Sequence, residues 1–423
     1  MQWIEKVRET QKRHANMDCK VYELKVVSRK LSHTTDKHLK KLFLEAKYVY
    51  NYTVAHYAEL TAYPKKEVEV KCADHFETRE LKHLSSQMIQ GVYQSVKQAI
   101  KGLAQKKRQG EKVGRLKFKA YKNSIPLNQY GITYKLDRRK NTVKLQGLKT
   151  PLKVRGMKQL PDNVEFANAQ LVRKPSGYYI HVCCFMPKQE HTPKGHVVGI
   201  DFGIQHNLTT TDGELIDIKV PETKAVKLAS KRLNKAYAKT KSKKSHNHRK
   251  YQAQLQRAYE KQNNKKKDMA NKVVHHLTHD YDLIAIQDEL ISAWHKGLFG
   301  KHVQKSTMGA IKQGLKSNPH TLVVPASYAS TQACPRCGKN TKHTLDKRDY
   351  QCESCGYSHP SRDIKSAAMI LLEALKTVSL EQRTQSSVEL APSTLEQGLT
   401  YVQTLLFGKE LAMKQGAHGF SLG

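Results

Sequence analysis

The stretch VVGIDFG, Val197–Gly203, places one carboxylate, Asp201, directly after a run of aliphatic residues. Valine, isoleucine and phenylalanine favour a strand that packs in a core. A carboxylate beside a core loses hydration, so its presence calls for a chemical reason. We therefore predict a stiff strand that carries a functional acid, with Gly203 leaving room beside it for a substrate backbone.

Two further elements combine an acid with an aliphatic segment. Residues 281–291, YDLIAIQDELI, predict a short strand that ends in Asp288 and Glu289. Residues 359–375, HPSRDIKSAAMILLEAL, predict a helix that begins near Asp363. Each acid taken alone is more often a turn or cap residue, and the helix dipole favours an acid in a first turn. Three converging acids would repel one another unless cations compensate their charge.

Magnesium offers that compensation, because it prefers hard oxygen ligands. Two such ions about 4 Å apart can activate a water molecule and stabilise the leaving oxygen of a phosphodiester. Asp201, Asp363 and one acid of the pair at 288–289 are therefore candidate ligands of a two-magnesium site. Asp288 and Glu289 point to opposite sides of a strand, so only one of them can face the metals.

The cysteines indicate a second metal. ACPRCG and QCESCG form two C-x-x-C units separated by fourteen residues, and a glycine follows each unit. Four thiolates suit a tetrahedral structural zinc, and glycine permits the backbone turn around sulfur. Two disulfides or a redox dithiol are the alternatives, but paired units in an intracellular chain argue against both. The predicted ligands are Cys334, Cys337, Cys352 and Cys355.

The charge indicates a polyanionic partner. The 423 residues contain 74 Lys and Arg against 37 Asp and Glu, a formal net charge of +37. Nucleic acid fits best, because each neutralised phosphate releases a counterion. An anionic membrane surface is the competing polyanion, but no stretch of roughly 18 apolar residues is present. The charged N-terminal segment lacks the apolar part of a secretory signal. We expect a cytoplasmic protein, in a prokaryotic cytosol or nucleoid, with no membrane partner.

The positive charge is concentrated in residues 224–272, which contain 17 Lys or Arg against Glu260 and Asp268. Its apolar residues keep helical spacing, so we predict a basic helical hairpin. A charge run is usually a solvated helical face, but the single sign of this one favours phosphate contacts. The candidate nucleic-acid contacts, at the predicted turn of the hairpin, are Lys243, Lys244, Arg249 and Lys250.

The first 190 residues predict a different unit. Residues 20–27 alternate as a strand, and two segments with helical periodicity follow, at 40–60 and 84–103. The chain then becomes β-rich up to a hairpin that turns at Pro175–Gly177. We predict a β-barrel interrupted by a helical insertion.

The order of these parts resembles the RuvC nuclease half of TnpB proteins, which certain transposons encode and to which the miniature type V CRISPR effectors are similar. It comprises the strand GIDFG, a basic helical hairpin, a strand ending in Glu, a four-cysteine ribbon, and an Asp eight residues beyond the last cysteine. Residues 84–103, 114–122, 287–304 and 329–338 carry further resemblance to this family.

The resemblance implies an RNA-guided DNA endonuclease with an RNase H-like RuvC domain. Its implied metal ligands are Asp201, Glu289 and Asp363, so we choose Glu289 and keep Asp288 as the alternative. The barrel and its helical insertion would hold a guide RNA and read a short DNA motif, while guide pairing supplies sequence specificity. The implied cofactors are two Mg²⁺ ions, a structural Zn²⁺ and the guide RNA. The implied partner is target double-stranded DNA, bound by a monomer or by a dimer on one RNA.

We therefore expect a multidomain α/β chain. A wedge barrel occupies residues 1–35 and 119–192 and is interrupted by a helical recognition insertion at 36–118. A RuvC nuclease follows at 193–330, with a basic helical hairpin at 222–279, and it resumes at 359–376. The zinc ribbon lies between them at 331–358, and a C-terminal tail occupies 377–423.

Two positions depart from the family pattern. Lys365-Ser366 stands where the third motif commonly has Asn-Ala, and Gln287 and Asp288 separate the aliphatic residues from Glu289. All three acids are nevertheless retained. Three alternatives stay open: a catalytically weak or inactive RNA-guided DNA-binding repressor, a zinc-ribbon RNA-binding or assembly protein, and a transposase that joins strands.

Overall fold

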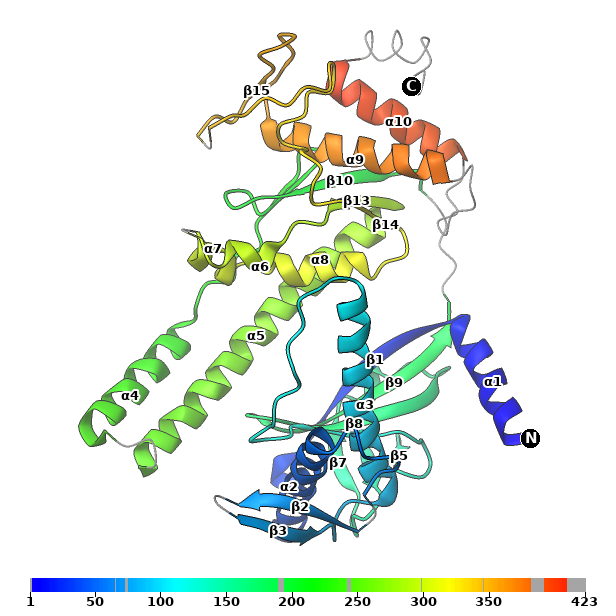
Figure 1. Cartoon of the computed structure of the whole chain (residues 1–423), viewed down its shortest axis with the longest axis vertical. Coiled ribbons are helices and arrows are strands. Elements are labelled where there is room, and N and C mark those ends of the chain that lie inside the picture. The colour runs from blue at the N-terminus through cyan, green and yellow to red at the C-terminus, as the bar shows by residue number, and fades with distance from the viewer. Residues whose placement is uncertain are drawn as a thin grey trace. The chain divides into compact units, whose positions relative to one another are not determined.

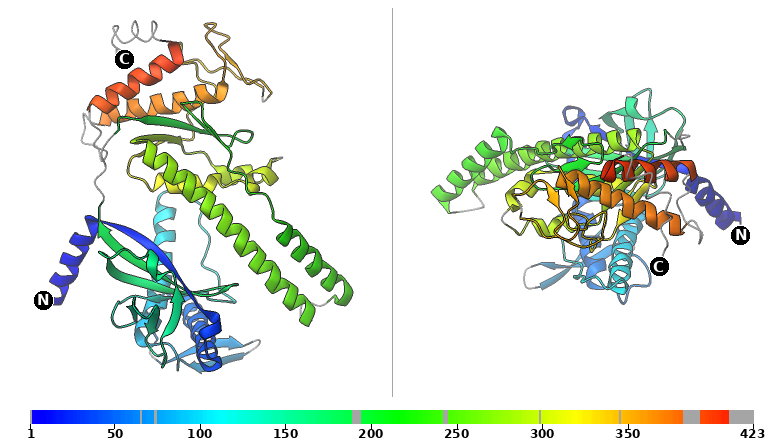
Figure 2. Two further views of the ribbon diagram at one scale, coloured as in Figure 1. Left: turned by 180° about the vertical axis from the view of Figure 1, so that it is seen from behind. Right: turned by 90° about the horizontal axis from the view of Figure 1, so that it is seen from above.

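The computed structural model describes residues 2–64, 66–72, 75–188, 194–241, 245–297, 299–344, 346–381 and 392–408. The chain divides into two compact units, Met1–Glu190 and His191–Gly423. Figures 1 and 2 show the chain in three views, coloured from the N-terminus to the C-terminus. Within the described residues, no helix combines the length and the apolar character needed to cross a membrane.

The first unit is built on a seven-stranded sheet with the order β4-β8-β9-β1-β7-β6-β5, in which all neighbouring strands pair antiparallel. The long hairpin β8–β9 turns where the sequence predicts, and Gly177 adopts a positive φ of 130° there. The strands are β1 Met17–Val26, β4 Ser124–Leu127, β5 Tyr134–Asp137, β6 Thr142–Leu145, β7 Leu152–Arg155, β8 Glu165–Lys174 and β9 Gly177–Pro187.

Two long helices, α2 (His33–Ala55) and α3 (Ser86–Arg108), share one hydrophobic core with this sheet. Ser32 and Ser85 cap the two helices by accepting backbone N–H bonds, as N-cap serines do. A hairpin of β2 (Glu67–Cys72) and β3 (His75–Glu80) lies between the helices in sequence. The sequence analysis predicted only helices in this insertion and did not identify the hairpin or the N-terminal helix α1 (Gln2–Ala15).

The second unit contains a five-stranded mixed sheet with the order β12-β11-β10-β13-β14. Its strands are β10 Val197–Phe202, β11 Leu208–Thr210, β12 Leu215–Ile216, β13 Leu283–Gln287 and β14 Thr321–Val324. The first three pair antiparallel, while β13 and β14 run parallel to β10. The predicted strand around Asp201 is β10, and all six of its residues are buried. This mixed sheet with its covering helices confirms the predicted α/β class of the unit.

Helices cover both faces of this sheet, and the period of two along β10 and β13 decides which residue meets which helix. Val198, Ile200, Ile284 and Ile286 share a core with α5 (His246–Asp280) and α8 (Met308–Lys316). The alternate residues pack against α9 (Arg362–Glu381) on the other face, where α10 (Pro392–Phe407) also lies (Figure 1). Part of the predicted tail is therefore a helix of this unit.

The remaining elements connect these layers. The predicted basic hairpin consists of α5 and the antiparallel helix α4 (Lys224–Thr240), which pack along each other (Figure 2). Short helices α6 (Ile291–Trp294) and α7 (Gly300–Lys305) follow β13. The two-stranded ribbon of β15 (Tyr350–Gln351) and β16 (Ser358–His359) precedes α9. Two 3₁₀ turns, Ser28–Lys30 and Met157–Gln159, complete the described elements.

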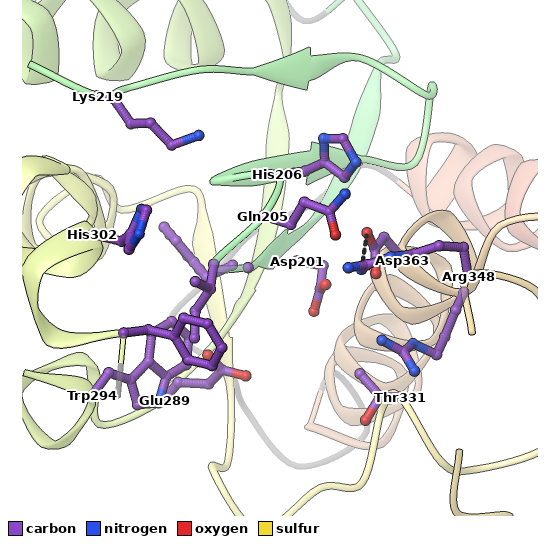
Figure 3. A pocket seen from close by; sticks show the side chains of 15 residues that line it. Asp201, Gln205, His206, Lys219, Glu289, Trp294, His302, Thr331, Arg348 and Asp363 are labelled. Atoms are coloured by element: carbon purple, nitrogen blue, oxygen red, sulfur yellow. Dashed lines mark ion pairs between the residues drawn. The ribbon is translucent and has the colours of Figure 1, made fainter. Parts of the chain in front are cut away.

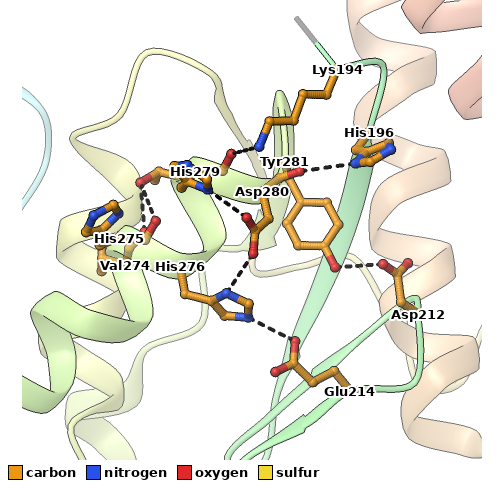
Figure 4. A network of polar contacts seen from close by, with 11 residues as sticks. Lys194, His196, Asp212, Glu214, Val274, His275, His276, His279, Asp280 and Tyr281 are labelled. Carbon is orange, nitrogen blue, oxygen red and sulfur yellow. Dashed lines mark hydrogen bonds and ion pairs between the residues drawn. The ribbon is translucent and has the colours of Figure 1, made fainter. Parts of the chain in front are cut away.

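A network of polar side chains closes the edge of the sheet at which the parallel strands β10 and β13 begin (Figure 4). The Tyr281 hydroxyl donates to Asp212 Oδ2 over 2.6 Å. His276 lies between Glu214, at 3.3 Å, and Asp280, at 2.8 Å. Since β10 and β13 are parallel, both end at the opposite edge, and the predicted acids lie at that edge.

Close packing of β10 on α9 generates a test. A Cβ at Gly199 would lie 2.1 Å from the backbone oxygen of Ala367 and 2.9 Å from Leu371 Cβ. Gly199→Ala should therefore destabilise the second unit by at least about 1–3 kcal/mol and lower its melting temperature by several degrees, because backbone cannot yield as a side chain can. Thermal denaturation followed by circular dichroism measures the change.

Gly309→Ala is the matched control, because a Cβ at this helical position of α8 meets nothing within 4 Å. It should leave stability unchanged or raise it by up to about 1 kcal/mol. Equal melting temperatures for Gly199→Ala and wild type would contradict the packing described here.

Candidate active site

One cavity of about 550 Å³ brings the three predicted acids together (Figure 3). Asp201 comes from β10, Glu289 from the segment after β13, and Asp363 from the first turn of α9. The acids are separated by 88 and 74 residues in sequence, yet the parallel strand ends and the α9 N-terminus meet at this edge. The rest of the wall is formed by Phe202, Gly203, Ile204, Gln205, His206, Lys219, Trp294, Phe299, His302, Thr331, Arg348 and Arg362.

Asp201 is the most buried of the acids, with 6% of its surface exposed. Its Oδ1 accepts a hydrogen bond of 3.0 Å from the Ser366 hydroxyl. Burial, and then the nearby charge of Glu289, raise the pKa of Asp201 to about 8. The bond from Ser366 opposes this rise, because it stabilises the ionised carboxylate. A carboxyl group whose charge is this unfavourable gains from a cation.

Glu289 and Asp288 have different surroundings, and strand parity explains the difference. Asp288 lies toward α8 and pairs with Lys312 at 2.6 Å and Lys316 at 3.0 Å. Hydrogen bonds from these two lysines lower the pKa of Asp288. Glu289 lies on the cavity, and burial raises its pKa to about 7. Its Oε2 is buried without a hydrogen-bond partner, an atom that a cation would satisfy.

Asp363 is partly buried, and Arg348 forms an ion pair with it. Arg348 Nη1 lies 3.9 Å from Asp363 Oδ2, and the two side chains are 44% and 20% exposed. A contact of this length between partly exposed groups is weak. The arginine therefore leaves Asp363 available on the cavity wall.

The chemistry of these donors fits magnesium. The site offers carboxylate oxygens, the acids repel one another, and one buried carboxylate oxygen has no hydrogen-bond partner. Among the described residues, the group of three or more potential ligands with atoms within 4.8 Å of one another is the cysteine set, so the acids stand farther apart. Asp201, Glu289 and Asp363 are the residues that would hold such ions.

A glycine is required at position 203 for a structural reason that the sequence analysis did not identify. A Cβ there would lie 2.5 Å from the backbone oxygen of His206, so glycine permits the tight turn after β10. Sequence reasoning also missed Trp294, His206 and Arg348 as wall residues. These residues come from loops and short helices without a periodic pattern, so no sequence signal identified them.

The four cysteines form one cluster in which every Sγ lies within 4.8 Å of the others. Cys334 and Cys355 sulfurs are 3.5 Å apart, and those of Cys337 and Cys352 are 3.6 Å apart. All four are free, not disulfide-bonded, and these separations suit thiolates around one tetrahedral ion. The cluster could therefore hold zinc as predicted.

A glycine in the left-handed region follows each cysteine pair, as the sequence predicts. Gly338 and Gly356 have φ values of 70° and 69°. Their N–H groups donate to the carbonyls of Cys334 and Cys352, at 2.9 and 3.0 Å, which closes both knuckles. Glycine adopts this conformation at no steric cost.

Two of the four predicted nucleic-acid contacts can be placed. Arg249 and Lys250 are exposed in the first turn of α5. Lys243 and Lys244 lie outside the described residues. The contacts themselves stay a prediction.

Two family models match parts of the chain between residues 181 and 370. Residues 181–292 match OrfB_IS605, described as a probable transposase, and residues 313–370 match the Cas12f1-like TNB domain. The first match contains Asp201 and Glu289, and the second contains the four cysteines and Asp363.

Relatives of known name include the TnpB-like proteins L79, L770 and R854 of Acanthamoeba polyphaga mimivirus. Each is 28% identical over 217 residues, covering 47% of this chain and 41% of the relative. The chain thus spans less than half the length of these relatives. A cryo-EM structure of a Cas12f1–sgRNA–target DNA complex aligns with a TM-score of 0.46 and 11% identity, over 84% of this chain and 99% of that one. The predicted resemblance to TnpB-like proteins is confirmed.

The cysteine cluster yields a prediction on metal content. Cys352→Ser should reduce bound zinc from about one ion per chain to a small fraction, because a structural site needs all four thiolates. The melting temperature of the second unit should fall by several degrees. Metal analysis by mass spectrometry and thermal denaturation measure the two effects. Cys19→Ser, at an exposed cysteine outside the cluster, is the control. Full zinc content in Cys352→Ser would refute the assignment.

The burial of Asp201 yields a prediction on pH. Its pKa rises from 3.8 to about 8 on folding, so between these values the folded state binds more protons than the unfolded state. Stability without divalent ions must therefore fall as pH rises through this window. Asp201→Asn removes the penalty, and should raise the melting temperature by a few degrees at about pH 9 and by less at about pH 5.

The matched control for this titration is Asp268→Asn, at an acid of α5 that is 65% exposed. It should shift the melting temperature equally at both pH values. Differential scanning calorimetry in chelator measures all three proteins. If Asp201→Asn behaved like Asp268→Asn, the buried acid would not cause the pH dependence.

Proposed function

We propose that this TnpB-like chain is an RNA-guided DNA endonuclease that cuts phosphodiester bonds at a single site formed by Asp201, Glu289 and Asp363. The observation that carries the proposal is the convergence of these three acids on one cavity at the carboxyl edge of a mixed sheet. The family matches enclose all three of them. Convergent acids on a described cavity also favour cleavage over a purely structural zinc-ribbon protein.

The residues of the chain have distinct roles in this proposal. Two magnesium ions held by the carboxylates would supply Lewis-acid activation of water and stabilise negative charge at the scissile phosphate. Asp201 would hold its metal from a buried strand that is packed on both faces. Glu289 contributes the unsatisfied oxygen, and Asp363 approaches from the opposite wall (Figure 3). Arg348 and Arg362 on the same wall are placed to attract a phosphate.

The guide RNA and the target DNA are the proposed partners. The net charge of +37 supports the binding of polyanions, because neutralised phosphates release counterions. The Cas12f1 chain that aligns with this one is bound to sgRNA and target DNA in its cryo-EM structure. We further propose that base pairing of the guide selects the target beside a short DNA motif. The basic hairpin, with Arg249, Lys250, Lys243 and Lys244, would contact phosphates.

A single active site imposes a requirement on the complex. Both strands of a duplex must reach one cavity in turn, so parts of the complex must move between cuts. The protein would work as a monomer or as a dimer on one RNA, in a prokaryotic cytosol or nucleoid.

The proposal is tested on the purified protein with its co-purified RNA. Sequencing that RNA identifies the guide, and a plasmid with a matching target beside randomised flanks serves as substrate. Wild type should linearise the plasmid in Mg²⁺ and not in chelator, and Asp201→Ala should lower the rate at least about 10³-fold, because an essential metal ligand is lost. Lys219→Ala, which removes a cation on the cavity wall, should have a smaller effect.

Binding is measured in parallel, because it separates cleavage from repression. Guide-dependent target binding by wild type without any cut would contradict the nuclease and favour an RNA-guided repressor. Joined products instead of cut ends would indicate a transposase. The absence of any bound RNA would favour a zinc-ribbon assembly protein.

A further inference from the structure

Gln287 and Lys365-Ser366, which take part in the two departures from the family pattern, lie together behind Asp201. Gln287 is 4% exposed, and both Lys365 and Ser366 are fully buried. Gln287 and Asp201 lie on the same face of the sheet. Ile200 pairs with Ile286 in the parallel register, and Asp201 and Gln287 are the residues that directly follow this pair. That face is covered by α9, which carries Lys365 and Ser366.

A chain of close polar side-chain contacts connects these residues. Ser366 Oγ lies 3.0 Å from Asp201 Oδ1 and 3.0 Å from Ser330 Oγ. Ser330 Oγ in turn lies 2.8 Å from Gln287 Oε1, and Ser330 is 3% exposed. The chain therefore runs from Asp201 on β10 through α9 and the loop at 330 to the end of β13.

The direction of these bonds follows from the number of hydrogens available. Gln287 Nε2 donates to backbone carbonyls of the loop after β14, at Pro325, Ala326 and Tyr328. Its amide oxygen can therefore only accept, so the Ser330 hydroxyl donates to it. Ser366 has one hydroxyl hydrogen and two neighbours within reach. When Asp201 is ionised, as a metal ligand must be, that hydrogen goes to Asp201 Oδ1, and the 3.0 Å contact with Ser330 Oγ is then a packing contact without a hydrogen.

Lys365 holds the middle of this chain in place. Its Nζ donates to the carbonyls of Ser330, Thr331 and Ala333, at 3.0, 3.2 and 2.7 Å. These three bonds use all three ammonium hydrogens. Nζ also lies 3.9 Å from the centre of the Tyr350 ring. Lys365 thereby attaches the loop at 330–333 to α9, so the Ser330 hydroxyl has little freedom to turn away.

We propose that Ser366 is a positioning residue, which fixes Asp201 Oδ1 so that the other carboxylate oxygen faces the cavity and its cation. The inference rests on the proposed function, because it assigns a metal to Asp201. Ser330, whose own hydrogen goes to Gln287, lies against the Ser366 oxygen, and Lys365 holds the loop that carries Ser330. A carboxylate with one oxygen anchored keeps a single rotamer, so less conformational freedom is lost when a metal binds.

Terbium luminescence tests the proposal without any cleavage reaction. Tb³⁺ replaces hard cations at oxygen ligands, and a nearby tryptophan sensitises its emission. The chain has two tryptophans, and Trp294 lines the cavity with Asp201. Trp3→Phe therefore provides a background in which selective tryptophan excitation reports the candidate site in the full chain with its RNA. Trp294→Phe in this background should abolish the signal.

Ser366→Ala in this background should weaken Tb³⁺ binding about 10-fold or more, as the loss of a partner that orients a metal ligand does. Ser366→Thr keeps the hydroxyl and should recover most of the affinity. Thr377→Ala, which removes an exposed hydroxyl from the same helix, should leave it unchanged. Circular dichroism checks that each variant is folded. If Ser366→Ala fails that check, Ser366→Val replaces it, because valine has the shape of threonine without the hydroxyl and should lose the affinity that Ser366→Thr keeps.

The outcomes separate this inference from the proposed function. If Asp201→Asn abolishes sensitised Tb³⁺ binding while folded Ser366→Ala binds like wild type, the positioning role is overturned and the metal site stands. If wild type shows no sensitised binding, or Asp201→Asn has no effect, both the metal site and the inference fail. If Ser366→Ala and Ser366→Thr weaken Tb³⁺ binding equally, the effect is one of general packing, and the role assigned to the hydroxyl is overturned.

Discussion

The cost of placing several carboxylates in one partly dry cavity governs the second unit of this protein. Burial and the charge of Glu289 raise the pKa of Asp201 to about 8, and burial raises the pKa of Glu289 to about 7. Without a cation, the folded state therefore favours the protonated form of both acids at pH values at which free carboxyl groups are ionised. A folded protein retains such an arrangement where a function needs it. The rest of the sheet, its covering helices and its loops serve to hold these groups at one edge.

The architecture achieves this with parallel strands. β10 and β13 begin at an edge closed by tyrosine, histidine and acid contacts (Figure 4), and both end where the acids lie. Period-two alternation then sorts the side chains between two faces. Asp288 turns toward lysines of α8, whereas Asp201 and Gln287 turn toward α9. One residue of shift in either strand would exchange these roles.

The cysteine cluster and the acids are connected through one loop. The loop that Lys365 holds, 330–333, leads directly into Cys334, and Arg348 of the ribbon contacts Asp363. Thr331 of the same loop lines the cavity. A closed metal site that does no chemistry can therefore influence a neighbouring one by fixing the backbone around it. The ribbon thereby helps to hold α9, and Asp363 at its start, in place.

The sequence alone determined those features that depend on local pattern. Cysteine spacing, glycines after each knuckle, the aliphatic run before Asp201 and the basic periodic segment each carry a short-range physical signal, and each predicted its element. The β2–β3 hairpin and α10 lacked such a signal and were missed. Tertiary structure alone decided which acid of 288–289 meets the cavity, because parity depends on the register between strands. It also decided that Gln287, Ser330 and Ser366 form one chain, since residues up to 165 apart in sequence meet only when the sheet and α9 pack.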